Sequence, residues 1–146
     1  MGMYPELMLI PMREELTRAG VKEARTPEAV DAAVTGTKGT LMIVVNSVCG
    51  CAAGKMRPAV RLAMENTVKP EESVTVFAGQ DTEATQRARE YFAGQQPSSP
   101  SIGLIREGKL MYFMPRAVIE TRDATKIASE LKQAFDKYCG AAAVTQ

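Results

Sequence analysis

The strongest constraint on the fold of this chain is an apolar run, TLMIVVNSV, at positions 40–48. The run is rich in β-branched residues, and its apolar content is nearly continuous rather than alternating. Continuous apolar runs of this length are typical of strands that are buried on both faces. The run therefore predicts a central strand in a sheet that has helices packed on both sides.

The segments around this run predict further strands and helices. Residues 73–79 (SVTVFAG) have the pattern of a short strand, and residues 101–114 that of a hairpin that turns at Glu107 and Gly108. Apolar spacing and helix-terminating glycines predict helices over 6–20, 26–36, 52–66, 81–94 and 123–139. This order of elements predicts an α/β fold with a mixed sheet.

Single residues refine the expected helices. Thr26 is the predicted N-cap of the helix over 26–36, and Asp81 that of the helix over 81–94. Pro11 is expected to break or kink the first helix. Pro58 lies too deep in its helix to occupy the first position, so a kink is expected there as well.

Composition narrows the class of protein. The chain has 146 residues, enough for a core of its own, and no repeat or linker divides it, so we expect one domain over residues 1–146. The net charge of +1, without a basic stripe, argues against nucleic-acid binding. No apolar stretch approaches the roughly 20 residues that cross a bilayer, and the first residues do not resemble a secretion signal. We therefore expect a cytoplasmic protein that binds neither nucleic acid nor membrane.

Two of the three cysteines stand one residue apart in VVNSVCGCAAGKMRP, at positions 44–58. Cys49 and Cys51 lie where the predicted central strand gives way to a helix. The first N–H groups of a helix lack internal partners, and the helix dipole places partial positive charge there. Both effects favour a thiolate, so Cys49 is expected to ionise more readily than a free cysteine, whose pKa is about 8.5. Lys55 and Arg57, further along the helix, are expected to add little.

A thiolate at this position predicts thiol–disulfide exchange. Cys49 can attack a mixed disulfide on a client protein, and Cys51 can then resolve the product. A disulfide across one residue closes a small, strained ring that is easily reduced. Gly50 is expected to help by adopting backbone angles that other residues avoid. The chain has no histidine, so Cys–His and Ser–His nucleophile systems are ruled out.

Two other interpretations of the cysteine pair are open from the residues alone. Buried cysteines often serve as small apolar core residues. Cys49 and Cys51 could instead bind a metal, but only Cys139 is left as a third thiolate, and closed zinc sites usually need four ligands. We therefore predict no metal site.

A second landmark is Pro100, which precedes the first strand of the hairpin in QQPSSPSIGLIREGKL, at positions 95–110. Proline is tolerated at the first residue of a strand because it need not donate to the ladder. Only about 5–6% of X-Pro bonds in folded proteins are cis. By frequency alone, the bond between Ser99 and Pro100 is expected to be trans.

A buried strand, cysteines at a helix start, a proline in that helix and a proline before a later strand together resemble the thioredoxin fold. The chain departs from thioredoxins because its cysteines are spaced C-x-C and it lacks tryptophan. It is more similar to the bacilliredoxin family, from about Tyr4 to Cys139. The similarity rests on PMREELTRAGV (11–21), VVNSVCGCAAGKMRPA (44–59), DTEATQRAREYF (81–92), PSSPSIGLI (97–105) and AFDKYC (134–139).

This resemblance implies a thioredoxin-like three-layer α/β/α fold and a thiol–disulfide oxidoreductase that removes bacillithiol from S-thiolated client proteins. Disulfide isomerase is the alternative description. Cys49 would attack and Cys51 would be its partner, with bacillithiol or a similar low-molecular-weight thiol as co-substrate and no bound cofactor. Pro100 would be a cis-proline, and Gly50, Ser99 and Pro100 would face the client. Family members often carry a histidine after the last strand, whereas PRAVIETRDA (115–124) has none.

Cys139 falls in the same resemblance, and we expect it to pack against the core, with a regulatory mixed disulfide as the alternative. A metal-binding thiolate module and a non-catalytic interaction domain are the alternatives to an enzyme.

Overall fold

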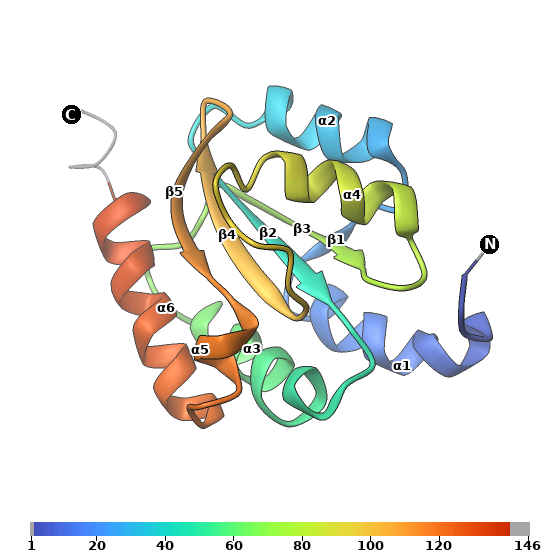
Figure 1. The fold of residues 1–146 in the computed structure, drawn as a ribbon. Coiled ribbons are helices and arrows are strands. Elements are labelled where there is room, and N and C mark those ends of the chain that lie inside the picture. The colour runs from blue at the N-terminus through green and yellow to red at the C-terminus, as the bar shows by residue number, and fades with distance from the viewer. Residues whose placement is uncertain (1, 141–146) are drawn as a thin grey trace.

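The computed structural model describes residues 2–140 and has a five-stranded sheet at its centre (Figure 1). The strands are β1 (Lys22–Glu23), β2 (Thr40–Asn46), β3 (Glu72–Phe77), β4 (Ser101–Arg106) and β5 (Lys109–Met114). Their order across the sheet is β1-β3-β2-β4-β5. β1, β3 and β2 are parallel, whereas β4 is antiparallel to both β2 and β5. The sheet is therefore mixed, as predicted.

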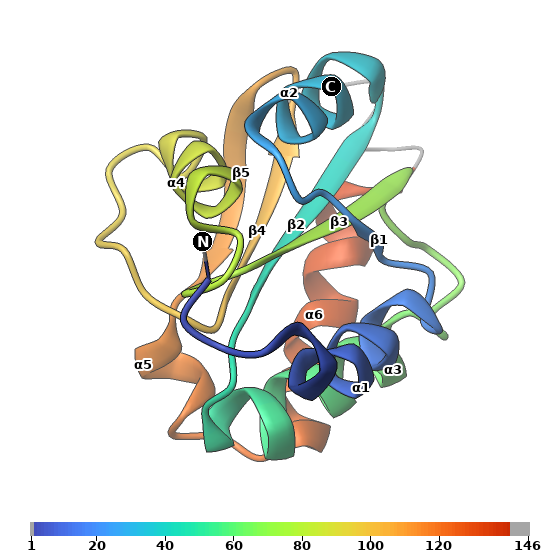
Figure 2. The ribbon, with the colours of Figure 1, turned by 90° about the vertical axis from the view of Figure 1, so that its right-hand side faces the viewer.

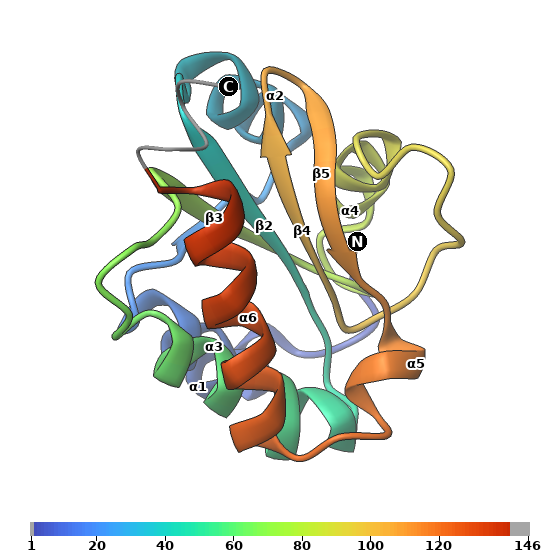
Figure 3. The same cartoon turned by 90° about the vertical axis from the view of Figure 1, so that its left-hand side faces the viewer.

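Helices cover both faces of this sheet (Figure 2). One face carries α2 (Pro27–Gly36) and α4 (Thr82–Glu90). The other face carries α1 (Glu6–Thr17), the π-helical segment η1 (Ala52–Met56), α3 (Arg57–Ala63) and α6 (Ala124–Tyr138). A single turn, α5 (Arg116–Ile119), follows β5 at one end of the sheet (Figure 3). The predicted thioredoxin-like three-layer α/β/α architecture is confirmed.

The predicted central strand is β2, and all seven of its residues are buried. Successive side chains on a strand point to opposite faces. Met42 and Val44 belong to the core beneath α1, α3 and α6. Leu41, Ile43 and Val45 belong to the core beneath α2 and α4. The apolar run is continuous because β2 lies between two layers of helices.

Two of the predicted signals at helix ends are confirmed. The Thr26 hydroxyl accepts a hydrogen bond from the N–H of Ala29 at 3.1 Å and so caps α2. Gly20, just after α1, has a φ of 97°, which glycine adopts at little cost.

The structure differs from the sequence prediction at both prolines. α1 is not broken at Pro11, where the hydrogen bond that proline cannot donate would go to the carbonyl of Leu7, an exposed residue. Pro58 lies at the start of α3, directly after the π-helical turn η1, rather than deep inside one α-helix. The helical hydrogen-bond spacing changes here because proline has no N–H to donate.

Two short elements, β1 and α5, are not predicted from the sequence. β1 is two residues paired with β3, and α5 is one turn of four residues. Neither is long enough to produce a periodic apolar pattern. The predicted domain of residues 1–146 includes residue 1 and residues 141–146, which lie outside the described residues. Within residues 2–140, no helix has both the length and the apolar character that a bilayer crossing requires.

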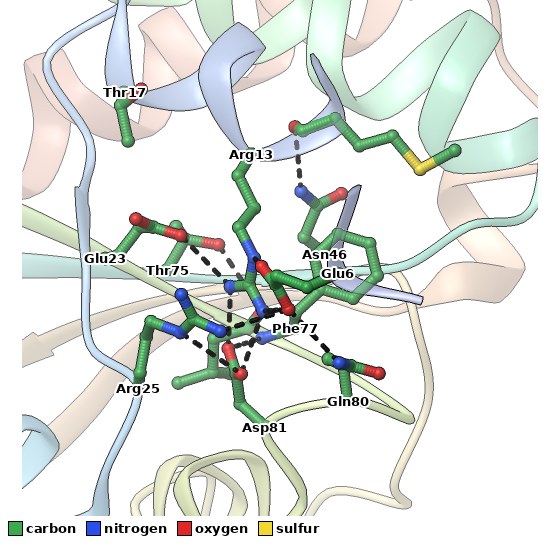
Figure 4. A network of polar contacts seen from close by, with 12 residues as sticks. Glu6, Arg13, Thr17, Glu23, Arg25, Asn46, Thr75, Phe77, Gln80 and Asp81 are labelled. Carbon is green, nitrogen blue, oxygen red and sulfur yellow. Dashed lines mark hydrogen bonds and ion pairs between the residues drawn. The ribbon is translucent and has the colours of Figure 1, made fainter. Parts of the chain in front are cut away.

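A buried ion-pair network ties α1 to the sheet (Figure 4). Asp81 stands at the predicted N-cap position of α4, but its side chain makes no capping hydrogen bond. Instead, each of its carboxylate oxygens accepts from the Arg13 guanidinium at 2.9 Å. The Phe77 N–H donates to the same carboxylate at 3.2 Å, and Glu6 accepts from Arg13 Nε at 2.7 Å. Both Arg13 and Asp81 are buried, so the pair connects α1 with the end of β3.

Candidate active site

The cysteine pair lies just beyond the end of β2. Figure 3 shows α5 at this same end of the sheet. β2 ends at Asn46, and helical backbone begins at Gly50 and continues through η1 and α3. Cys49 and Cys51 are both half-buried and both carry free thiols. Their predicted position, at a junction between a strand and a helix, is confirmed.

The surroundings of Cys49 favour its thiolate. The Ser47 hydroxyl donates a hydrogen bond to Cys49 Sγ at 3.0 Å. Burial raises the pKa of Cys49. Hydrogen bonds from Ser47 and from the backbone N–H groups of Ala52 and Cys51, together with the charge of Arg116, lower the pKa by more than burial raises it. The net pKa lies below the ordinary value of a cysteine. The lowered pKa has the direction predicted from the helix start, but the hydrogen bond from Ser47 lowers it more than either backbone N–H group of the helix start does.

A buried arginine, Arg57, binds the segment that precedes Cys49 in the sequence. Arg57 is 2% exposed, and its Nη1 donates to Asn46 Oδ1 at 3.0 Å and to the Ser47 carbonyl at 2.8 Å. The Ser47 N–H donates to the same Asn46 oxygen at 2.9 Å. Glu15 balances the charge of Arg57 at 3.1 Å. Arg57 therefore acts by positioning Ser47, which in turn contacts the thiol.

With both thiols free, Gly50 does not use the unusual backbone angles that the sequence predicts for the disulfide form. It is exposed and lies in the first helical turn, and its φ is outside the left-handed region. Because helical φ values are open to every L-residue, no special backbone angle requires glycine here. A Cβ at Gly50 would meet no atom within 4 Å.

The loop before β4 approaches the cysteines together with α5. The Ser99–Pro100 peptide bond is cis, as the family resemblance implies, so the trans expectation from frequency is wrong for this loop. Pro100 is buried. Arg116, the first residue of α5, donates from Nη1 to the Ser99 carbonyl at 3.3 Å and from its backbone N–H to Ser98 Oγ at 3.2 Å. These contacts join α5 to the cis-proline loop.

A cleft of about 310 Å³ opens beside Cys49. Of the predicted site residues, Cys49 and Ser99 line this cleft, whereas Gly50, Cys51 and Pro100 do not. The rest of its lining includes Ser47, next to Cys49 in the sequence, and Tyr4, Arg89 and Arg116 from distant parts of the chain. The fold therefore places an activated thiol in a hollow that also holds two arginines.

Cys139 lies at the other end of β2. Its neighbour Tyr138 accepts a hydrogen bond, through its carbonyl, from Thr40 at the start of that strand. Seven residues of extended chain span about 20 Å, so Cys139 is too far away to join Cys49 and Cys51 around one metal ion. Burial raises the pKa of Cys139. Among residues 2–140, no group of three or more His, Cys, Asp or Glu side chains is placed to hold a metal.

Sequence reasoning does not identify Ser47, Arg89 or Arg116. Ser47 has a local signal, because a hydroxyl two residues before a predicted nucleophile is within hydrogen-bonding reach of it. Arg89 and Arg116 have none, because they belong to α4 and α5 and reach the cleft only through the tertiary fold.

The contacts of Cys49 predict how its alkylation depends on pH. Because its pKa is lowered, the rate of reaction with iodoacetamide is expected to level off at a lower pH than for a free cysteine, whose pKa is about 8.5. Ser47→Ala removes the hydroxyl 3.0 Å from Sγ and is expected to move the inflection to higher pH. Thr35→Ala, which removes an exposed hydroxyl on α2, is the matched control and is expected to match the unmodified protein. Mass spectrometry of the Cys49 peptide provides the readout, and an unchanged inflection in Ser47→Ala would contradict the assignment.

Known proteins are similar to this sequence over nearly its whole length. The family model described as disulphide isomerase matches residues 4–139. A bacilliredoxin of Koribacter versatilis is 66% identical over 141 residues, which cover 97% of each chain. A bacilliredoxin of Salinibacter ruber is 53% identical over 94% of this chain and 82% of the relative. One from Bacillus licheniformis is 49% identical over 93% of this chain and 95% of the relative.

Solved thioredoxin structures share the fold. The oxidised thioredoxin from Plasmodium falciparum superimposes with a TM-score of 0.58 over 82% of this chain and 99% of that chain, at 16% identity. The thioredoxin of Malassezia sympodialis gives a TM-score of 0.57 over 82% of this chain and 91% of that chain, at 14% identity. At this level of identity the likeness establishes a thioredoxin-like fold.

Proposed function

The chain belongs to the bacilliredoxin family and is a thiol–disulfide oxidoreductase, and from this premise we propose that it removes bacillithiol, or a similar low-molecular-weight thiol, from S-thiolated client proteins. The observation that carries the proposal is Cys49, a half-buried thiol with a lowered pKa that lines a small cleft beside the cis-proline loop. A cleft of about 310 Å³ suits a small thiol rather than a folded domain. The proposed setting is the cytoplasm, where thiols are kept reduced.

In the first step, the Cys49 thiolate attacks the sulfur of the small thiol in the mixed disulfide. A disulfide forms between Cys49 and the small thiol, and the original S–S bond breaks. The sulfur of the client leaves as a thiolate and takes up a proton. The client thereby recovers its free cysteine, and the small thiol is transferred to the enzyme.

In the second step, the Cys51 thiolate attacks the Cys49 sulfur. This attack releases the small thiol, which takes up a proton, and leaves a disulfide between Cys49 and Cys51. Two molecules of a reducing thiol, or one dithiol, then supply two electrons and two protons, form a disulfide themselves, and return both cysteines to their thiol forms. Cys51 suits this role because it lies in the first turn of the helix that follows Cys49, whereas Cys139 is at the other end of β2.

The description of the matching family model, disulphide isomerase, favours a second candidate function. An isomerase uses the same attack by Cys49, but on a disulfide between two client cysteines, and the client is neither oxidised nor reduced overall. Refolding of a scrambled disulfide protein without any small thiol tests this candidate. Recovery of native disulfides under those conditions favours isomerisation, whereas the proposed function requires a mixed disulfide with a small thiol.

The proposed function predicts that Cys51→Ser accumulates an adduct, because the mixed disulfide on Cys49 is then not resolved. The reduced variant is incubated with a model protein whose single cysteine carries bacillithiol. Intact mass is expected to show one bacillithiol added to the variant and the same mass lost from the model protein.

Two matched variants control this experiment. Cys49→Ser with Cys51→Ser is expected to form no adduct, and Cys139→Ser with Cys51→Ser is expected to form the same adduct as Cys51→Ser alone. An adduct that persists without Cys49 would reject Cys49 as the attacking thiol. If no bacillithiol adduct forms but glutathione is readily transferred from a glutathionylated protein, the exchange mechanism would be supported and the small thiol would not be bacillithiol.

A further inference from the structure

We propose that the cleft beside Cys49 contains an anion subsite, formed by Arg89 and Arg116, that binds a carboxylate of the small thiol carried by the client. This inference rests on the proposed function and specifies the substrate class: mixed disulfides whose small thiol bears a carboxylate.

The surroundings of Arg89 are the main evidence for this subsite. Arg89 is a partly buried residue of α4, and its Nε is buried without a hydrogen-bond partner among residues 2–140. Burial lowers the pKa of Arg89, with no carboxylate contributing an opposite effect. Nearby Arg87, by contrast, contacts both Asp31 and Glu90. A partly desolvated guanidinium without a counter-charge is unfavourable, so an external carboxylate that reaches Arg89 would gain binding free energy.

Arg89 also lies where two hollows meet. The cleft beside Cys49 shares Arg89 and Gly79 with a second hollow of about 400 Å³ over α4. Thr85 lines this second hollow, is 3% exposed, and has a buried hydroxyl without a hydrogen-bond partner in the described part of the chain. Buried polar groups in proteins are normally paired. A polar ligand that extends from Cys49 past Arg89 would therefore find a second unsatisfied group.

Arg116 places a second positive charge in the same cleft, from α5. It donates to the Ser99 carbonyl and to Glu120, each at 3.3 Å, and these contacts hold it at the cis-proline loop. Its charge acts on the Cys49 thiolate. Guanidinium groups bind carboxylates through paired hydrogen bonds, so a ligand with its sulfur at Cys49 has a cation available on both α4 and α5.

This subsite would also determine which sulfur Cys49 attacks. When the carboxylate of the small thiol is bound, its sulfur lies next to Cys49, and the client becomes the leaving group. The client then leaves as a free thiol, and the enzyme carries the small thiol, as the proposed function requires. Without the subsite, attack on the client sulfur would link the client protein to Cys49.

The test compares two mixed disulfides of one single-cysteine model protein. One carries 3-mercaptopropionate and the other carries its uncharged amide, so the two probes have the same length and differ by one charge. The kcat/KM for removal is expected to be on the order of tenfold higher for the carboxylate, and this ratio is expected to shrink at high salt. Arg89→Gln is expected to lower the ratio several-fold, because only Arg116 then remains in the subsite, and Arg89→Lys is expected to retain more of it.

Arg87→Gln is the matched control, because Arg87 is on the same helix but already paired, and it is expected to keep the ratio of the unmodified protein. Circular dichroism checks the fold of each variant, and the pH profile of Cys49 alkylation checks that its ionisation has not moved. A ratio near one in the unmodified protein, or an unchanged ratio in Arg89→Gln, would overturn the subsite and leave the proposed function standing. If the protein removes none of the three groups (3-mercaptopropionate, its amide or bacillithiol), the proposed function itself would be overturned.

Discussion

Cys49→Ser is expected to lower the turnover of mixed disulfides by about a thousandfold or more, to the level of the uncatalysed exchange. A serine hydroxyl is not ionised near neutral pH, and its oxygen cannot form the disulfide through which the thiol is transferred. The substitution changes one atom of a half-buried side chain, so the fold is expected to persist. Release of the small thiol from a thiolated model protein, followed over a single turnover, measures the effect.

Two comparisons make this result specific to Cys49. Cys139→Ser is expected to react at nearly the rate of the unmodified protein, because Cys139 lies at the other end of β2. Cys51→Ser is expected to retain the first transfer and to lose only the resolution step. Retention of a tenth or more of the rate in Cys49→Ser would mean that another group is the nucleophile.

Asp81→Asn is expected to lower the free energy of unfolding by about 3 kcal/mol, which corresponds to a fall in Tm of about 10 °C. Asp81 accepts both guanidinium hydrogen bonds of Arg13, and its side chain is only 5% exposed. The neutral amide would leave the charge of Arg13 buried with weaker compensation. We expect the lower end of the range for broken buried pairs because Glu6 and Glu23 still contact Arg13. Urea unfolding followed by circular dichroism gives the free energy directly.

An exposed ion pair provides the control for Asp81→Asn. Glu14 and Arg18 are 2.7 Å apart at the C-terminal end of α1, but their side chains are 43% and 80% exposed. Glu14→Gln is therefore expected to change stability by less than about 0.5 kcal/mol. If Asp81→Asn costs less than about 1 kcal/mol, the remaining carboxylates are sufficient partners for Arg13, and Asp81 is not the residue that anchors α1.

Local signals account for what could be predicted from the sequence. The apolar run at 40–46 became β2, Thr26 caps its helix, and Cys49 lies at a helix start, because each of these features depends on a few neighbouring residues. The helical backbone angles of Gly50 in the form with free thiols could not be predicted, because they depend on where the first helical turn begins. The predicted capping role of Asp81 is wrong because a remote guanidinium, that of Arg13, competes with the nearby N–H groups for its carboxylate.

By itself, the sequence determined the layered α/β fold and the position of two thiols at the end of its central strand. Periodicity, capping and the helix-start effect are short-range, so they can be recognised in the order of residues. Only the tertiary structure decided what surrounds Cys49: the cis bond of the loop before β4, the buried Arg57 behind Ser47, and the two arginines of the cleft. Burial and charge act through space between elements that are distant in the chain, and only the packing of helices and loops on the sheet brings those elements together.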